Sequence, residues 1–426
     1  MVATADDGLR ARRLYLTRMT DCGAEAVAAA FRSVGLDAVV LPPPDAASLD
    51  LGSRHLSGDE CLPAKVTLGD YLKVALAPGF DPRRTAFVMP TTEGPCRFGQ
   101  YAPAIRQILA GLGAGEALVL SPTSGDGYRE IGTLGPALSR ATWQAVVASD
   151  LLRKLLLKTR PYETEPDAAD AAYRTSLAEL VAALEIPGRR GAARTEALAV
   201  GLTRIRQRFR AVPARYERGR LLIGVQGEIY CRMEEFCNGD LIRRLEDWGA
   251  EVWLADIAGW VWYCNAYEAA LLSLSGRRLS TAMLTARIRE RIQRADQAAL
   301  SAPFAEDCLG AEEPEGSAEL LAAAAPYLPH PGAAGEMVLS AGMVDWFFRH
   351  GADGILDVSP FSCMNGLVSE ALYPRQSAEH AGMPIRLFTV DGTARDPGLE
   401  LEIFLEMCRA YQRRKPHPRR YPPWFA

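Results

Sequence analysis

The sequence predicts an α/β protein of two lobes, each with a mostly parallel sheet, joined by a helical segment. Three observations predict this class. A strand–helix–strand pattern lies near the N-terminus, the same pattern returns after residue 220, and the chain between them is rich in Ala, Leu, Arg and Glu. Alternating strands and helices are typical of parallel sheets with helical crossovers. Each lobe is therefore expected to be Rossmann-like or flavodoxin-like.

The two patterns share the same helix-end signal. In the first, Val27 and Phe31 lie on one face of a helix at 22–34, and Gly35 follows where a left-handed residue ends a helix. In the second, Leu245 lies on the apolar face of a helix at 236–248, and Gly249 ends it. The expected strands around these helices are 14–19, 36–41, 221–225 and 251–254.

The remaining elements complete this organisation. Further strands are expected at 85–89, 354–358 and 385–390, and further helices at 98–112, 142–210, 266–298 and 336–350. The polar stretch 311–319 (AEEPEGSAE) is expected to be a solvated loop. The domain boundaries that follow are an N-terminal lobe at 10–140, a helical connection at 141–218, and a C-terminal lobe at 219–426 with a helical insertion around 266–330.

Composition excludes several classes of partner. Lys and Arg total 48 and Asp and Glu total 52, so the net charge is −4 and no basic block is present for nucleic acid. No apolar run approaches the roughly 18 residues of a membrane span. The N-terminus MVATADDGLRARR has no apolar core of a secretory signal, so a cytoplasmic location is expected.

Nine cysteines are many for a cytoplasmic chain, where structural disulfides are disfavoured. Buried free cysteines are one explanation, and metal ligands are the other. The five histidines are scattered and neither CxxC nor HExxH occurs, so a zinc site is not indicated. The cysteines are Cys22, Cys61, Cys96, Cys231, Cys237, Cys264, Cys308, Cys363 and Cys408.

Three of these cysteines lie at turns before predicted helices. Cys61 follows Gly58, while Cys96 and Cys363 each come between a predicted strand and a helix. The carboxyl ends of parallel strands are where ligands bind, and a helix N-terminus favours a thiolate. Thiolates supplied by loops can hold an iron–sulfur cluster without local spacing. From the residues alone, these three cysteines are either cluster ligands or buried structural cysteines.

Several segments resemble a known family. These are ECLPAKVTLGDYL, MPTTEGPCRFGQY, GEIYCRMEEFCN, LIRRLEDWGAEVW and GADGILDVSPFSCMNGLVSEAL. They resemble the acyl-CoA dehydratase activase-related proteins, relatives of the 2-hydroxyacyl-CoA dehydratase subunits, the benzoyl-CoA reductase subunits and the double-cubane cluster proteins. The resemblance runs from about residue 14 to residue 410. The chain has no GxxxxGK[ST] phosphate loop, which the nucleotide-binding activase domain would bring.

The resemblance implies specific cluster ligands. Cys61, Cys96 and Cys363 match the family's cysteines in its ECLP, GPCRFG and PFxCMPG motifs, although Asn365 stands where the family usually has Pro. The implied cofactor is a [4Fe-4S] cluster in the cleft between the lobes. Cys22, Cys231 and Cys237 are candidates for a second set of ligands that would complete a double cubane. The alternative is that these three are ordinary buried thiols. No role is assigned to Cys264, Cys308 or Cys408.

The same resemblance implies low-potential electron transfer or reductive chemistry. A separate ATP-dependent activase is the expected electron donor, and an acyl-CoA thioester or another small molecule is the expected acceptor. Glu228, after a strand, is a candidate general acid or base, with a helix cap or an ion pair as the alternative. A non-catalytic accessory protein that stores a cluster or scaffolds an activase and a dehydratase is the second hypothesis, and a cluster-free ligand-binding protein is the third. The chain is compatible with a homo- or hetero-dimer.

Overall fold

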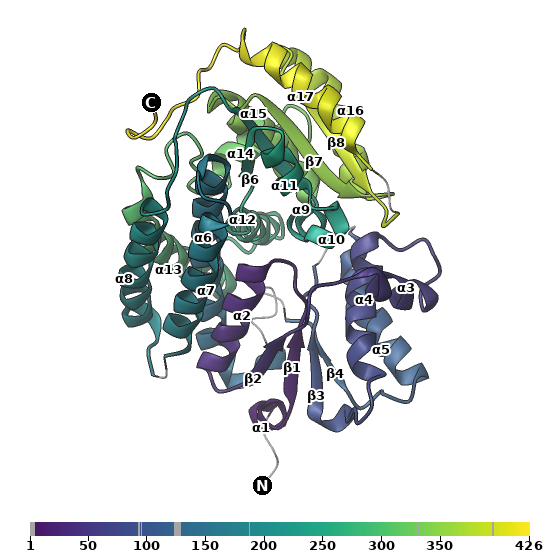
Figure 1. Ribbon diagram of the computed structural model, residues 1–426. Coiled ribbons are helices and arrows are strands. Elements are labelled where there is room, and N and C mark those ends of the chain that lie inside the picture. The colour runs from purple at the N-terminus through teal and green to yellow at the C-terminus, as the bar shows by residue number, and fades with distance from the viewer. Residues whose placement is uncertain are drawn as a thin grey trace. The chain divides into compact units, whose positions relative to one another are not determined.

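The computed structural model describes residues 5–92, 94, 96–122, 129–186, 188–329, 333–393 and 396–426 (Figure 1). Contacts divide the chain into two compact units. Unit 1 comprises Met1–Ser149 and Ala178–Leu198, and unit 2 comprises Asp150–Leu177 and Ala199–Ala426. Each unit contains a four-stranded, fully parallel sheet, which confirms the predicted α/β class. The predicted boundaries at residues 140 and 218 stay a prediction.

The two sheets have the same topology. In unit 1 the strands β1 (Arg13–Leu16), β2 (Asp37–Val40), β3 (Thr85–Val88) and β4 (Leu118–Leu120) lie in the order β2-β1-β3-β4. In unit 2 the strands β5 (Leu221–Gly227), β6 (Ala250–Leu254), β7 (Gly354–Pro360) and β8 (Ile385–Val390) lie in the order β6-β5-β7-β8. The order therefore reverses between β1 and β3 and between β5 and β7, and such switch points are where α/β sheets bind ligands.

Helices surround both sheets. In unit 1, α2 lies beside β1 and β2, while α4 and α5 lie beside β3 and β4 (Figure 1). The first helices are α1 (Ala5–Arg10), α2 (Asp21–Ser33), α3 (Ala46–Arg54), α4 (Leu62–Ala75) and α5 (Tyr101–Gly111). The predicted helical connection consists of α6 (Gly135–Thr159), α7 (Ala168–Glu185) and α8 (Gly191–Arg210), and each of these contributes residues to both units. Short 3₁₀ helices cover Pro82–Arg84, Arg97–Gln100, Arg129–Leu134, Arg160–Tyr162 and Ala302–Phe304.

The helices of unit 2 correct one prediction. The expected helix at 236–248 is two short helices, α10 (Glu235–Asn238) and α11 (Leu241–Asp247), and another short helix, α9 (Ile229–Met233), precedes them. The break has a local cause, because Gly239 and Asp240 both adopt the left-handed conformation, with φ of 66° and 58°. The later helices are α12 (Ala258–Leu274), α13 (Thr281–Ser301), α14 (Ala318–Ala324), α15 (Glu336–Arg349), α16 (Met364–Glu379) and α17 (Gly398–Gln412).

The expected solvated loop at 311–319 is also wrong in part. Ala311, Pro314, Gly316 and Ser317 are buried, because this segment packs over the end of the sheet in unit 2. The core beneath the sheet is formed by Trp253, Phe347 and their neighbours. Among the described residues, no helix combines the length and the apolar character that crossing a membrane requires.

Helices α3 and α4 of unit 1 approach each other so closely that no side chain fits at Gly52 or Gly69, where they meet. A Cβ atom on Gly69 would lie 1.7 Å from the carbonyl oxygen of Ser48, and one on Gly52 would lie 1.8 Å from that of Lys65. The hydroxyl of Ser48 also donates to Asp70 Oδ1 at 2.5 Å. This contact holds α4 against α3, and α4 begins directly after Cys61.

We expect Gly69→Ala to destabilise the protein by roughly 1–3 kcal/mol, because backbone rather than a flexible side chain must move. Gly111→Ala is the matched control, since no atom lies within 4 Å of the Cβ position at the end of α5. Chemical denaturation monitored by circular dichroism measures both. Equal stability of the two variants would contradict the close contact.

The basic, proline-rich segment 413–426 is ordered against unit 2. The guanidinium of Arg419 pairs with Glu251 of β6 at 2.5 Å, and the two side chains are 2% and 1% exposed. Burial opposes the charge on Glu251, but Arg419 and Lys158 lower the pKa of this carboxyl to about 2. Phe425 is buried beside Tyr162 and Tyr216. The segment therefore contributes Arg419, Pro422 and Phe425 to the buried part of unit 2, while most of its other residues are exposed.

Candidate functional site

The three cysteines singled out by the sequence occupy the same local position. Cys61 is the N-cap of α4, Cys96 is the N-cap of the 3₁₀ helix Arg97–Gln100, and Cys363 is the N-cap of α16. Their φ angles are −68°, −69° and −68°, and each is half-buried. An N-cap residue faces the unpaired N–H groups of the first helical turn. The Cys96 thiol accepts such a hydrogen bond from the N–H of Phe98, whereas the Cys61 thiol caps no backbone N–H of α4.

The surroundings of these caps differ. Cys96 follows β3 and Cys363 follows β7, so the two have equivalent places in the repeated topology, beside each switch point. Cys61 instead lies between α3 and α4, so it is not at the end of a strand. Directly before Cys363, Ser362 has a φ of 59°, a left-handed conformation that is costly for a residue other than glycine. Such strain is common where a site dictates the backbone.

Within unit 1, two contacts join the loops that carry Cys61 and Cys96. The hydroxyl of Tyr101, in the helix after Cys96, lies 2.6 Å from Cys61 Sγ. The guanidinium of Arg97 donates to the carbonyl oxygen of Asp59. Unit 1 thereby brings together the loops of two of the three predicted ligands. The backbone N–H of Phe98 also donates to Cys96 Sγ at 3.5 Å.

The environment of Cys363 in unit 2 disfavours a free thiolate. Burial raises the pKa of the Cys363 thiol to about 12. The backbone N–H groups of Gly366 and Asn365 act in the opposite direction, while the carboxylates Glu228 and Glu336 raise the pKa further. The expectation that a helix N-terminus yields a thiolate is therefore overruled by burial here. A metal ion would reverse this, because coordination deprotonates a thiol.

Cys231 and Cys237 lie close together in α9 and α10. Both are buried and their thiols are hydrogen-bonded to each other. Burial raises the pKa of Cys231 well above its usual value. The hydrogen bond from Cys231 is the largest single influence on Cys237 and lowers its pKa, but burial and the carboxylates Glu234 and Glu228 together raise it to about 11. Their nearly complete burial and their hydrogen bond to each other favour the ordinary-cysteine alternative over a second ligand set.

The other cysteines lie in less distinctive places. Cys22 is the second residue of α2 in unit 1, as expected, and its thiol donates to the carbonyl oxygen of Ser149 at 3.6 Å. Cys264 lies in α12, Cys408 in α17, and Cys308 in the turn after the 3₁₀ helix Ala302–Phe304. All nine cysteines are free thiols. In the part of the chain that the structure describes, no three His, Cys, Asp or Glu side chains are grouped to hold a metal ion.

Glu228 is a helix cap. Its carboxylate accepts hydrogen bonds from the N–H groups of Tyr230 and Cys231, at 3.1 and 2.8 Å, at the start of α9. This is the alternative that sequence reasoning left open beside a catalytic role. The adjacent Arg232 is buried and pairs with Glu336 at 3.5 Å.

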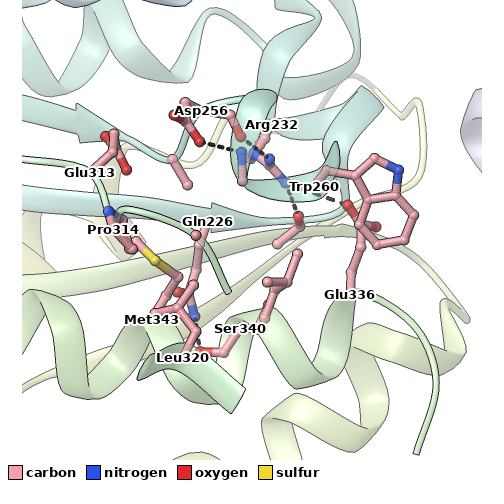
Figure 2. Close-up of a pocket in the computed structure, with 15 residues that line it drawn as sticks. Gln226, Arg232, Asp256, Trp260, Glu313, Pro314, Leu320, Glu336, Ser340 and Met343 are labelled. Carbon is pink, nitrogen blue, oxygen red and sulfur yellow. Dashed lines mark hydrogen bonds and ion pairs between the residues drawn. The ribbon is translucent and has the colours of Figure 1, made fainter. Parts of the chain in front are cut away.

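Unit 2 contains a pocket that sequence reasoning did not find (Figure 2). It lies at the carboxyl ends of β5 and β6, opens to solvent, and leaves room inside for only a few water molecules. Its polar lining comes from Gln226 and Arg232, which are near each other in the sequence, and from the distant Asp256, Glu313 and Glu336. The available signal was weak, because a polar residue after a strand, such as Asp256, is also common in ordinary turns.

Buried carboxyl groups give this pocket its electrostatic character. Burial, then the neighbouring Glu228, raise the pKa of Glu336 to about 8, although Arg232 lowers it. Burial, then Glu313 and Asp150, raise the pKa of Asp256 well above its usual value. Both groups are therefore held in the folded protein where ionisation is costly.

This arrangement predicts a pH-dependent stability. A carboxyl whose pKa is raised from 4.5 to about 8 on folding binds more protons in the folded state between these values. The unfolding free energy should therefore fall as pH rises from 4.5 to about 8. We expect Glu336→Gln to flatten this slope, with little change in stability at pH 5. Glu402→Gln, at an exposed position of α17, should leave the slope unchanged. Denaturation at several pH values tests this, and an equal slope in all three proteins would contradict it.

A scan against protein-family models and a search of curated proteins found no match to this sequence. The family resemblance of the cysteine-containing segments therefore stays a prediction.

Proposed function

We propose that this protein carries low-potential electrons on an iron–sulfur cluster ligated by Cys61, Cys96 and Cys363. The observation that supports it is the shared geometry of these three cysteines, since each is a half-buried helix N-cap with the same backbone conformation. An ordinary set of core-filling cysteines has no reason to share one capping position. Cys231 and Cys408, by contrast, are buried inside helices.

Cysteine thiolates are the usual ligands of the proposed cofactor. When bound, a [4Fe-4S] cluster supplies one-electron redox chemistry, and its potential responds to charge and to hydrogen bonds at the sulfurs. The N–H of Phe98 donates to Cys96 Sγ, and the N–H groups of Gly366 and Asn365 face Cys363. Glu228 places negative charge near Cys363. Since negative charge opposes the gain of an electron, this carboxylate favours a low potential.

The partners follow from the family resemblance and are part of the proposal. An ATP-dependent activase donates the electron, and an acyl-CoA thioester or another small molecule accepts it. Nine free thiols suit a reducing compartment such as the cytoplasm. If the chain instead stores a cluster or scaffolds an activase and a dehydratase, it accepts the electron without turning over a substrate.

The experiment is reduction of the anaerobically reconstituted protein, followed by electron paramagnetic resonance. We expect a signal from the reduced cluster at a potential toward the low end of the roughly −700 to +450 mV range of such clusters. Reduction by activase and ATP with consumption of an acyl-CoA supports the enzymatic form, and reduction alone supports the accessory form. A protein that shows no reducible centre at any potential in this range contradicts the proposal.

A further inference from the structure

Helix α13 of unit 2 turns an apolar face away from the protein. Leu284, Ile288 and Ile292 follow one another at every fourth residue and are between 37% and 60% exposed, and they form the α13 face. The buried side chains of α13, such as Met283 and Leu300, lie on its other side. A surface helix ordinarily keeps its outer side polar. Exposed aliphatic side chains in line therefore indicate a surface that another molecule covers.

Helix α17 repeats this pattern. Leu399, Ile403 and Met407 have the same spacing and are between 54% and 71% exposed, and they form the α17 face. The other side of α17 is buried in unit 2 through residues such as Phe404 and Tyr411. Helices α13 and α17 lie apart within unit 2, so neither covers the other (Figure 1). Both faces are thus open in a single copy of the chain.

Positive charge lies along one edge of the α13 face. Arg287 and Arg291 are exposed, and each comes three residues after an aliphatic residue of this face, so both lie on the same edge. Within the described part of the chain, neither arginine forms an ion pair, whereas Arg294 of the same helix pairs with Glu290 at 2.8 Å. The edge therefore holds two positive charges that are available to a partner.

Negative charge lies along the equivalent edge of the α17 face. Glu402 and Glu406 are exposed, and they follow Leu399 and Ile403 by the same three residues. Glu402 forms no ion pair among the residues that the structure describes, and Glu406 pairs with Arg409 of its own helix, an exposed pair that contributes little. The two faces thus have the same apolar pattern and edges of opposite charge.

This pattern selects one mode of pairing. Two helices that pack face to face and antiparallel are related by a twofold axis perpendicular to both, so their equivalent edges meet. With Ile288 opposite Ile403, Arg287 lies beside Glu406 and Arg291 beside Glu402, each offset along the axis by about 3 Å, or two residue rises. Pairing of two α13 faces or of two α17 faces would instead bring like charges together. A parallel pair would place the charged edges on opposite sides.

We propose that the α13 face of one copy of this chain binds the α17 face of a second copy, with the two helices antiparallel. A second copy accounts for both open faces at once, whereas an unrelated acidic protein or an anionic lipid surface would leave the α17 face uncovered. The two faces are different surfaces, so the contact is heterologous and each copy can bind two others. The contact requires no cluster and stands independently of the electron-transfer function.

A contact of a few helical turns is small, so the association is weak and the chain is monomeric at the low concentrations of denaturation experiments. Sedimentation velocity of the full-length chain from about 1 to about 300 µM, a range that spans weak contacts, measures it. We expect the average mass to rise with concentration above that of one chain. A wild-type chain that stays monomeric throughout overturns the proposal, because the faces then bind something other than a second copy.

Charge reversal locates the contact. Arg287→Glu with Arg291→Glu, and separately Glu402→Arg with Glu406→Arg, are each expected to weaken association about tenfold or more, because like charges then meet. Arg174→Glu, at an exposed position of α7, reverses a charge outside both faces and should associate as the wild type does. Wild-type association of either double variant overturns the proposal.

A mixture of the two double variants separates lost contacts from misfolding. Equimolar mixing sets opposite charges against each other again, so the average mass should return to that of the wild type at the same total concentration. A misfolded variant could not restore it. Two variants with wild-type melting curves that remain monomeric when mixed overturn the assignment.

Discussion

Replacing Cys363 by Ala should remove most of the iron from anaerobically reconstituted protein. The intact chain is expected to hold about four irons, as one [4Fe-4S] cluster does. Two remaining thiolates hold such a cluster poorly, so Cys61→Ala and Cys96→Ala should have the same effect. Cys264→Ala is the matched control, because Cys264 is also half-buried but lies inside α12 rather than at a helix cap. Iron and labile sulfide per chain are the measurements.

The outcomes of this series separate the remaining alternatives. If Cys308→Ala lost its iron while Cys363→Ala kept it, the ligand assignment would be wrong. Cys231→Ala decides the role of the buried pair in α9 and α10. Loss of half of about eight irons would indicate a double cubane, whereas unchanged iron would identify Cys231 as an ordinary buried thiol.

The second large effect concerns the ion pair between the tail and β6. Arg419→Met is expected to lower the unfolding free energy by about 3 kcal/mol, because it leaves the buried charge of Glu251 without its closest partner. Lys158, 3.5 Å from Glu251, offsets part of the loss. Arg420→Met is the control, since the side chain of Arg420 is 65% exposed and its loss should change stability little. Denaturation curves for the two variants test this.

The ion pair between Arg419 and Glu251 also predicts how stability changes at acidic pH. The pKa of Glu251 lies at about 2 in the folded protein, so the stability from its ionised form is present above pH 4.5 and is lost as pH falls toward 2. In Arg419→Met this acid-dependent part should shrink. If the variant equalled the wild type in stability at pH 7, the buried ion pair would not contribute as argued.

The strands and most helices were predictable because their signals are local. The strand at 385–390 has the predicted bounds, and α2 begins and ends within one residue of its prediction. The prediction of one helix at 236–248 was wrong although the sequence held a signal against it. Asn238, Gly239 and Asp240 form a turn-favouring run within the apolar periodicity. Strand β4 was missed because it has three residues, too few to show a pattern.

The candidate sites also differ in how far the sequence predicts them. The special position of Cys61, Cys96 and Cys363 was visible in the sequence because each begins a helix that periodicity predicts. The raised pKa of Cys363 was not, because it arises from burial and from Glu336, a residue of another segment. The pocket of unit 2 also escaped prediction, since Asp256 and Glu313 meet through the fold rather than along the chain.

Iron and labile sulfide per chain, measured together with Mössbauer spectra on protein reconstituted with ⁵⁷Fe without oxygen, test the central claim most directly. The proposed cluster predicts about four irons and about four sulfides per chain, with spectra of a cubane cluster bound by cysteine sulfur. A fully reconstituted, folded chain that holds neither iron nor sulfide would contradict it.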